Sequence, residues 1–367
     1  MSATDPGRLG IGVVGAGRVG APLASALRSA GHAVVGASGS SPATLERIES
    51  LLPAVPVLDV PEVVRRSELV LLTVPDDDLP GVVGGLAATG AWQAGQLVVH
   101  TAGRFGWQVL EPARAAGAIP LAIHPAMTFT GTSLDIQRLV GAVFAVTAPT
   151  PVLPIGQALV VEVGGEPVVV AEESRALYHA ALAHGANHLV VLVAQAAQAL
   201  AAAGIERPGR TLEHLLVAAL DGALRTEQLD PPRDEVEGGP GAISALTGPV
   251  VRGDVGTVRG HLDVLGSLDV ASAADIASSY RVLARSATSR ALAAGRIGPD
   301  AAAALLDVLE APSAPAVGPG LDRPGLAGLD DAGLGRTEPG DARPGRAEPG
   351  DPHPDRPSTP PSPGEPA

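Results

Sequence analysis

The feature that most constrains the fold of this chain is a glycine-rich turn near the N-terminus, Gly15-Ala16-Gly17-Arg18-Val19-Gly20. An apolar run typical of a buried strand (11–14) precedes it, and a helix-like run (21–30) follows. Strand, G-x-G-x-x-G turn and helix together are typical of a dinucleotide-binding fold. Gly15 permits the sharp turn, Gly17 lets the backbone approach a pyrophosphate, and Gly20 lets the helix pack on the strand. The helix N-terminus offers unpaired N–H groups to phosphate. We therefore expect all six residues to contact a dinucleotide; the alternative is a turn that only packs a helix on a sheet.

The composition limits the class of protein. A chain of 367 residues suggests about two domains. Its formal net charge of −14 argues against nucleic acid or an anionic membrane as partner. The lack of cysteine excludes disulfides and Cys-ligated zinc. We find no secretion signal, and the most apolar helical stretch, 189–203, is too short to cross a bilayer. We therefore expect a soluble, cytoplasmic protein.

Hydrophobic periodicity divides the chain into three parts. In residues 8–171, short apolar runs alternate with helix-like stretches, which predicts an α/β fold with a Rossmann-like, doubly wound sheet. Residues 172–311 read as an all-α domain, whose first helix, 174–203, is apolar on most faces and is expected to be central and buried. Residues 312–367 are rich in proline and are expected to be disordered. The expected strands are 11–14, 33–36, 57–58, 69–74, 97–100, 121–124, 143–146 and 168–170.

The loop after the second strand bears on the choice of cofactor. NAD-type domains carry an acidic residue there, which holds the ribose 2′-OH. Here the position falls on Ala37 or Ser38, and no acid is present. Hydroxyl groups suit a 2′-phosphate, and Arg18 can reach the same region, so NADP is favoured over NAD. The residues expected to contribute are Ser38, Ser40 and Ser41. The alternative is a solvated turn and a protein indifferent to the 2′-phosphate.

Other candidate residues follow the later strands, because ligands of open α/β sheets lie at the carboxyl ends of the strands. Val74 and Pro75 are expected to run along the cofactor, and Thr101 follows the next strand. His100 and His124 end consecutive strands, which suggests a reaction centre. Each histidine taken alone is more often a structural, hydrogen-bonded residue.

The long apolar helix carries a polar face of its own. His184, Asn187 and His188 lie at i, i+3 and i+4, and His179 is about 80° around the helix from Asn187. Polar groups on such a helix line a cleft or pair at a subunit interface. With no H-E-x-x-H sequence and no evident third ligand, we expect no metal site.

A compact loop in the helical part offers groups that can hold a carboxylate. It runs from 246 to 254 and contains Thr247, Gly248 and Arg252. Asp254 has a simpler explanation as a helix N-cap, and Arg252 has two possible acidic partners, Asp254 and Glu235.

Six motifs together resemble one family: GVVGAGRVG, TVPDDDL, VHTAGRFG, AIHPAMTFTG, HGANHLV and LTGPVVRGDVGTVRGHL. It is the bacterial family that pairs a Rossmann-like domain with a C-terminal helical domain of unknown function. It belongs to the 6-phosphogluconate-dehydrogenase-like superfamily, with ketopantoate reductase and pyrroline-5-carboxylate reductase. The resemblance covers about residues 8–311. It implies a nicotinamide-dependent reductase, a small-molecule substrate in the interdomain cleft, and a homodimer formed through the helical domain.

One departure from these relatives concerns the proton donor. Ketopantoate reductases use a lysine four residues before an asparagine on the long helix. Here Asn187 is present, position 183 is alanine, and all 25 basic residues of the chain are arginine. A histidine is the natural substitute, and the candidates are His184, His179 and His124, with Asn187 orienting the substrate.

Three functions remain open from the sequence. The first is NADP-dependent reduction of a small 2-oxo acid, as in ketopantoate reductase. The second is reduction of a cyclic imine, which needs no lysine acid. The third is an NADP-binding sensor without catalysis.

Overall fold

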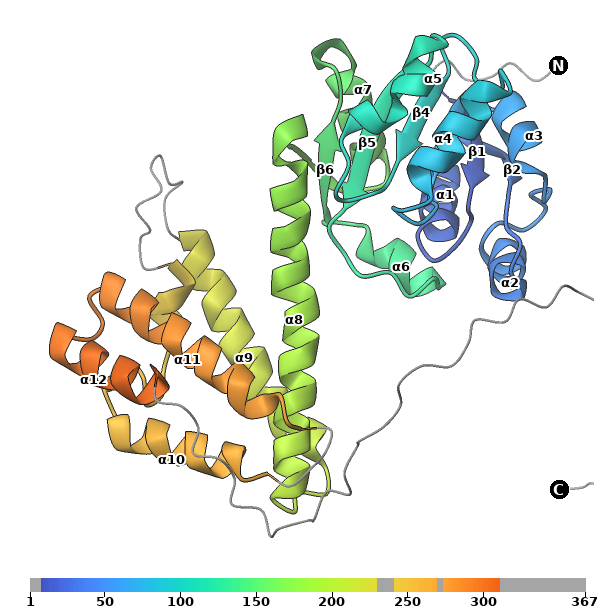
Figure 1. Ribbon diagram of the computed structural model, residues 1–367. Coiled ribbons are helices and arrows are strands. Elements are labelled where there is room, and N and C mark those ends of the chain that lie inside the picture. The colour runs from blue at the N-terminus through green and yellow to red at the C-terminus, as the bar shows by residue number, and fades with distance from the viewer. Residues whose placement is uncertain (1–7, 230–240, 269–272, 311–367) are drawn as a thin grey trace, which may run out of the picture. The chain divides into compact units, whose positions relative to one another are not determined.

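The computed structural model describes residues 8–229, 241–268 and 273–310 (Figure 1). The tail predicted at 312–367 and the acidic residue Glu235 lie outside these ranges.

The first part is built on one seven-stranded sheet with the order β2-β1-β3-β4-β5-β6-β7. All neighbouring strands pair in parallel except β5 and β6, which are antiparallel. The predicted Rossmann-like sheet is therefore confirmed. The strands are β1 Gly10–Val14, β2 Ala33–Ala37, β3 Leu69–Leu72, β4 Leu97–His100, β5 Ile119–Pro125, β6 Val143–Thr147 and β7 Glu166–Val169.

The strand predicted at 57–58 is wrong. Val57 forms only an isolated bridge with Ala37. Pro56 has no N–H to donate, and α3 begins at Val60 with Asp59 as its N-cap, so the extended segment is too short to pair further.

Helices cover both faces of the sheet, because the strand side chains alternate between two separate cores. In β3, Leu69 and Leu71 belong to one core, while Val70 and Leu72 belong to the other. The first core includes residues of α1, α2 and α7, and the second includes residues of α3, α4 and α5. The helices are α1 Gly20–Ser29, α2 Pro42–Leu51, α3 Val60–Arg65, α4 Leu79–Ala88, α5 Glu111–Ala115, α6 Ser133–Arg138 and α7 Leu153–Glu162.

The second part is helical. A third core lies among its last three helices and contains Val258, Ala291 and Leu305. The helices are α8 Arg175–Ala202, α9 Pro208–Leu229, α10 Val255–Gly266, α11 Ile276–Ala293 and α12 Pro299–Glu310.

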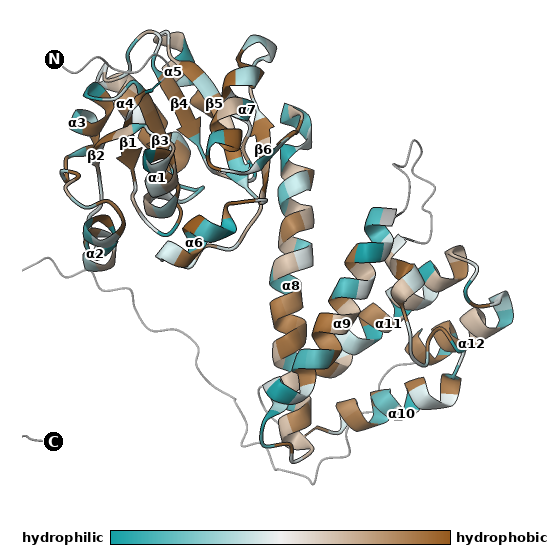
Figure 2. Cartoon of the chain, turned by 180° about the vertical axis from the view of Figure 1, so that it is seen from behind, coloured by the Kyte–Doolittle hydropathy of each residue, from teal (hydrophilic) through white to brown (hydrophobic). Residues whose placement is uncertain are grey.

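The expectation that the long helix is buried is wrong for the single chain. Only Arg175 and Gln195 of α8 are buried, and Val190 is 69% exposed. Figure 2 shows apolar residues along this helix and along α9. The reason is that α8 packs mainly on α9, which leaves most of its apolar surface without a partner in the chain.

The segment 172–202 is long and apolar enough to cross a membrane, by length and composition only. This corrects the shorter apolar stretch expected from the sequence. A single such helix is weak evidence for a membrane span, because packed helices of other proteins pass the same test.

Candidate active site

The glycine-rich turn has the shape that a dinucleotide requires. Gly15 has a φ of +82°, and an added Cβ would lie 3.1 Å from Val74. A Cβ on Gly20 would overlap the hydroxyl of Thr73, so this glycine lets α1 pack closely on β3. A Cβ on Gly17 would meet only the Gly15 carbonyl, at 3.8 Å, so the backbone is open on that side.

Three backbone donors of this turn are free. Ala16 N–H donates to Ser38 O at 2.9 Å, and Gly17 N–H donates to Gly15 O at 2.6 Å. By contrast, in the part of the chain that the structure describes, no hydrogen bond uses the N–H groups of Arg18, Val19 or Gly20. Free N–H groups at the start of a helix form an anion site, so this turn fits the pyrophosphate of a dinucleotide.

The serines after β2 are already partly engaged. The Ser38 hydroxyl accepts the Gly15 N–H at 3.1 Å and is buried. Ser41 is the N-cap of α2 and accepts the Thr44 N–H at 3.2 Å. Ser40 is exposed. Ser38 and Ser41 therefore shape the turn and the helix start, whatever they contact in a ligand.

Val74, Pro75 and Thr101 lie where expected, at the carboxyl ends of β3 and β4. Val74 contacts the glycine turn, and Pro75 is exposed. The sequence interpretation missed Thr73, whose hydroxyl donates to Gly15 O at 2.7 Å. Thr73 thus ties β3 to the turn. Its position directly after an apolar strand was the available signal.

The structure brings two predicted histidines together at the carboxyl end of β5. The rings of His124 and His179 lie 6.1 Å apart between centroids. Tyr178 also contacts His124, with its hydroxyl 2.9 Å from His124 Nδ1. An added Cβ on Gly103 would lie 2.5 Å from His179 and 3.0 Å from His124 Nε2, so a glycine is needed for the two rings to sit here.

Arg175 fixes the start of α8 to the sheet beneath these rings. Its side chain is buried, and it donates to Thr147 Oγ1 at 2.9 Å and to Ala122 O at 3.0 Å. Weaker contacts reach Ala145 O and Gly103 O. Because its donors are directed to β5, β6 and the loop after β4, Arg175 positions Tyr178 and His179 rather than binding a ligand.

Burial sets the protonation states of the cluster. It lowers the pKa of His124 to about 4, and the charge of Arg175 acts in the same direction. It also lowers the pKa of Arg175 to about 10 and raises the pKa of Tyr178. At neutral pH the cluster therefore holds a neutral imidazole, a neutral phenol and a cation.

One nitrogen of His124 is open. A neutral imidazole carries one ring proton, so either the phenol donates to Nδ1 or Nδ1 donates to the phenol. Nε2 makes no hydrogen bond among the described residues. Among the described residues, every buried side-chain nitrogen or oxygen has a hydrogen-bond partner, so the unbonded Nε2 is accessible to solvent. In the first arrangement Nε2 presents a proton at the carboxyl edge of the sheet.

His100, in contrast, is a structural residue. It is fully buried, Nε2 bonds Gly106 O at 2.8 Å, and Nδ1 accepts the Ala102 N–H at 3.2 Å. Both ring nitrogens are used, so His100 shapes the loop after β4.

The remaining polar residues of α8 lie apart from this cluster. His184 and His188 bond each other through their Nδ1 atoms at 2.8 Å, and they and Asn187 are exposed. No group of three metal-ligating side chains occurs within the described ranges.

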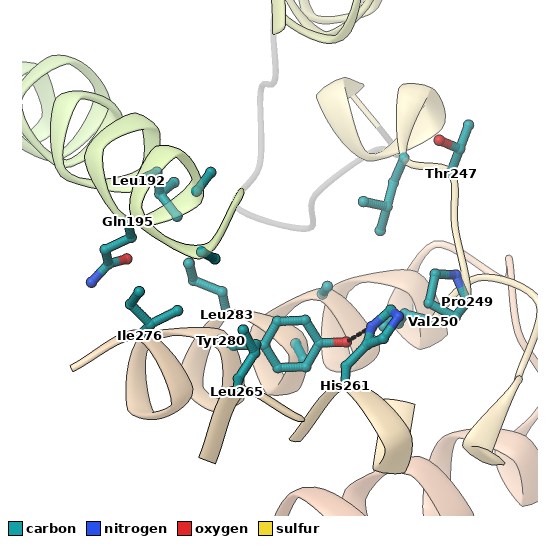
Figure 3. A pocket seen from close by; sticks show the side chains of 15 residues that line it. Leu192, Gln195, Thr247, Pro249, Val250, His261, Leu265, Ile276, Tyr280 and Leu283 are labelled. Carbon is teal, nitrogen blue, oxygen red and sulfur yellow. Dashed lines mark hydrogen bonds between the residues drawn. The ribbon is translucent and has the colours of Figure 1, made fainter. Parts of the chain in front are cut away.

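The loop 246–254, which was predicted to hold a substrate carboxylate, lines a separate cavity of about 430 Å³ (Figure 3). Thr247 and α8 residues Leu192 and Gln195 lie on opposite sides of the cavity in this view. The His261–Tyr280 pair, whose Nδ1 and hydroxyl oxygen are 2.8 Å apart, lines the cavity between them. These α8 residues lie 13 to 20 positions beyond His179, or roughly 20–30 Å along the helix. Gly248, with a φ of +101°, and exposed Arg252 belong to the same loop. Asp254 accepts the Thr257 N–H at 3.1 Å and is the N-cap of α10, which confirms the N-cap role predicted for it from the sequence.

Comparison with protein families agrees with this architecture. Residues 1–125 match the Rossmann-like domain, and residues 142–287 match the domain of unknown function DUF2520. The chain belongs to the family that joins these two domains. The predicted family is therefore confirmed, and the cluster around His124 lies at the junction of its Rossmann-like and DUF2520 parts. No curated protein matches the chain.

Solved structures share the fold at low sequence identity. The chain is similar to a candidate NADP oxidoreductase from Bacteroides fragilis, with 22% identity and a TM-score of 0.59 over 76% of this chain and 98% of that one. It is also similar to an imine reductase from Pseudomonas sp., with 15% identity and a TM-score of 0.55 over 83% and 100% of the two chains. An imine reductase from Myxococcus stipitatus, in complex with NADP⁺, has 16% identity and a TM-score of 0.55 over 81% and 99%.

Proposed function

We propose that this protein is an NADP-dependent oxidoreductase. The observation that carries the proposal is that one edge of one sheet holds both the turn with three free N–H groups and the His124–Tyr178–His179 cluster. A dinucleotide lying along that edge has its pyrophosphate at the turn and its nicotinamide toward the later strands. The similar structures described as NADP oxidoreductases and imine reductases support the proposal through their fold.

The residues of the turn fit the cofactor. The N–H groups of Arg18, Val19 and Gly20 would hold the pyrophosphate, and Val74 and Pro75 would line the path toward the nicotinamide. NADPH, when bound, supplies a hydride. Because no acidic residue stands at Ala37 or Ser38, nothing at the end of β2 repels a 2′-phosphate.

His124 and Tyr178 are placed to supply the proton. Nε2 of His124 would donate to the reduced atom of the substrate, while Nδ1 takes the phenol proton of Tyr178. The resulting phenolate faces Arg175, whose guanidinium carbon is 5.9 Å from the tyrosine ring. An alkoxide is a strong base, so a neutral imidazole backed by a phenol is acidic enough to protonate it.

The proposed substrate is a small molecule with a polarised double bond, either the carbonyl of a 2-oxo acid, as in ketopantoate, or a cyclic imine. A protonated imine needs no proton from the enzyme after hydride transfer. The two chemistries therefore differ in their dependence on Tyr178, which separates them experimentally.

We also propose that the protein acts as a homodimer in the cytoplasm, with a second copy, rather than lipid, covering the apolar surface of the long helices. On α8, Leu177 and Val190 are 75% and 69% exposed, and on α9, Leu215 is 66% exposed. Exposed apolar surface of this extent is typical of an interface. The cavity that Thr247 lines meets α8 at residues 192–199, far along the helix from His179. A substrate carboxylate at the His124 cluster that is bound by Thr247 and Arg252 would therefore contact the loop of a second copy.

The test is a titration of the purified protein with NADPH and NADH, followed by nicotinamide fluorescence, with later addition of 2-oxo acids and cyclic imines. We expect NADPH to bind and to be oxidised by one substrate class. Binding without turnover on either class would favour a sensor. Binding of neither nucleotide would contradict the proposed function.

A further inference from the structure

Two arginines from different elements converge beside the glycine turn. Arg18 follows Gly17 in the turn, and Arg47 lies on α2. An ideal Cβ built on Gly131 would lie 2.6 Å from Nε of Arg47 and 3.1 Å from Cγ of Arg18. The two side chains therefore meet at one point of the loop between β5 and α6.

That loop is held rigidly against them. The buried carboxylate of Asp135 accepts the N–H groups of Gly131 at 2.6 Å and Thr130 at 2.8 Å, and the Thr130 hydroxyl at 2.9 Å. Burial alone would raise the pKa of Asp135, but the hydrogen bond from Gly131 and those from Thr130 and Thr132 outweigh it and lower the pKa. Gly131 also has a φ of +82°, and the missing side chain leaves the space that Arg47 occupies.

The charge of this pair is not neutralised within the described part of the chain. No ion pair there involves Arg18 or Arg47, although most other arginines of the sheet part have an acidic partner, among them Arg65, Arg66, Arg104, Arg114 and Arg138. The end of β2 beside them offers Ala37 and Ser38 instead of an acid. The nearby Asp135 carboxylate binds backbone N–H groups and Arg138 instead. In a chain of net charge −14, two adjacent cations without an ion-pair partner among the described residues mark a place for an anion.

We propose that Arg47, together with Arg18, binds the 2′-phosphate of NADP and is the residue that selects NADP over NAD. This inference rests on the proposed function. A phosphate monoester carries about two charges and three acceptor oxygens, which two guanidinium groups match by paired hydrogen bonds. The pyrophosphate already has its own donors, the free N–H groups of Arg18, Val19 and Gly20, so the arginine side chains are left for a second anion.

The experiment compares wild type, Arg47→Gln and Arg47→Lys by isothermal titration with NADPH, NADH, adenosine 2′,5′-bisphosphate and ADP. We expect Arg47→Gln to raise the Kd of NADPH and of adenosine 2′,5′-bisphosphate by roughly 10- to 100-fold, while the Kd values of NADH and ADP change little. Arg47→Lys keeps the charge and loses the planar fork, so its loss is expected to be smaller. Arg114→Gln is the matched control, because this exposed arginine pairs with Glu111 within α5, away from the turn.

The outcomes separate this inference from the proposed function. Equal weakening of NADPH and NADH by Arg47→Gln would assign Arg47 to the pyrophosphate and overturn the inference. Unchanged NADPH binding in a variant whose thermal unfolding is that of wild type would also overturn it, with the oxidoreductase intact. If the wild type binds neither nucleotide, both proposals fail together.

Discussion

His100 and His124 show how one residue type at equivalent positions takes two roles. Both stand at or near strand ends of the same sheet, and burial lowers the pKa of each to about 4. The difference lies in their hydrogen bonds. Backbone groups use both nitrogens of His100, whereas His124 uses one nitrogen for Tyr178 and leaves the other accessible. Only the second arrangement leaves a nitrogen for a substrate.

Replacing Tyr178 by Phe tests the proton relay. The ring keeps its contact with Arg175, but the hydroxyl that bonds His124 is lost. If the substrate is a 2-oxo acid, we expect kcat to fall by about 10²-fold or more with little change in the Kd of NADPH, measured by steady-state kinetics and fluorescence titration. An unchanged kcat for a 2-oxo acid would contradict the relay. An unchanged kcat for a cyclic imine is expected.

The two histidines also predict a pH dependence of stability. The unfolded chain takes up protons near pH 6.5, while the folded protein resists them until about pH 4. The contribution of each histidine to the free energy of unfolding is therefore fully present above pH 6.5. It falls by about 1.4 kcal/mol per pH unit as the pH is lowered from 6.5 toward 4. Urea unfolding at pH 7 and pH 5 measures this fall.

His100→Gln is the matched variant for that measurement, since its amide can still donate to Gly106 O. The variant is expected to be less stable at pH 7 but to lose less stability between pH 7 and pH 5 than wild type. An equal loss in both proteins would show that His100 does not contribute to the pH dependence.

At the scale of elements, the sheet and the turn followed from local sequence, and the burial of α8 did not. Apolar runs bounded by glycine and proline predicted all seven strands, because a strand covered on both faces has to be almost wholly apolar. The edge strand β7 is mostly exposed and begins with Glu166, but its Val-rich run marks it as a strand. The strand predicted at 57–58 did not form, because two apolar residues are too short a segment for a ladder and make only an isolated bridge. The site needed tertiary contacts, since Thr73, Tyr178 and Arg175 acquire their roles from partners that are distant in the sequence, at separations of 28 to 58 residues.

Close packing between α1 and β3 predicts the effect of Gly20→Ala. The added methyl would overlap the Thr73 hydroxyl and push α1 from the turn. We expect a loss of about 2 kcal/mol or more in the free energy of unfolding, measured by urea, together with loss of NADPH binding.

Gly85→Ala in α4 is the control for this change. A Cβ there meets nothing within 4 Å, so the same substitution is expected to stabilise the helix by about 0.5–1 kcal/mol. Equal effects of the two substitutions would contradict the role given to Gly20.

At the scale of the whole molecule, the helical part has an exposed apolar surface of the extent that is typical of an interface. The exposed residues on α8 and α9 include Leu177, Val190, Leu215, Val217 and Leu224. The proposed dimer covers this surface. It would also place the Thr247 loop of one copy at the His124 cluster of the other, a contact that the two groups do not make within a single chain.

Val190→Glu tests the dimer. Light scattering after size exclusion is expected to give twice the chain mass of 36.5 kDa for wild type and a monomer, or a dimer much weakened on dilution, for the variant. Val161→Glu is the control, because Val161 is similarly exposed, at 61%, but lies on α7 of the sheet part. A monomeric wild type would contradict the proposed dimer.

The sequence by itself determined the Rossmann-like sheet, the conformation of the glycine turn, the absence of an acid after β2 and the helical second part. These features depend on local periodicity and on which residues tolerate a given backbone. The tertiary structure decided which polar residues meet. It placed both Tyr178 and His179 against His124, assigned His100 to the backbone, brought Arg47 to Arg18, and left His184 and Asn187 exposed. Such pairings depend on how distant segments pack, and no spacing along the chain encodes them.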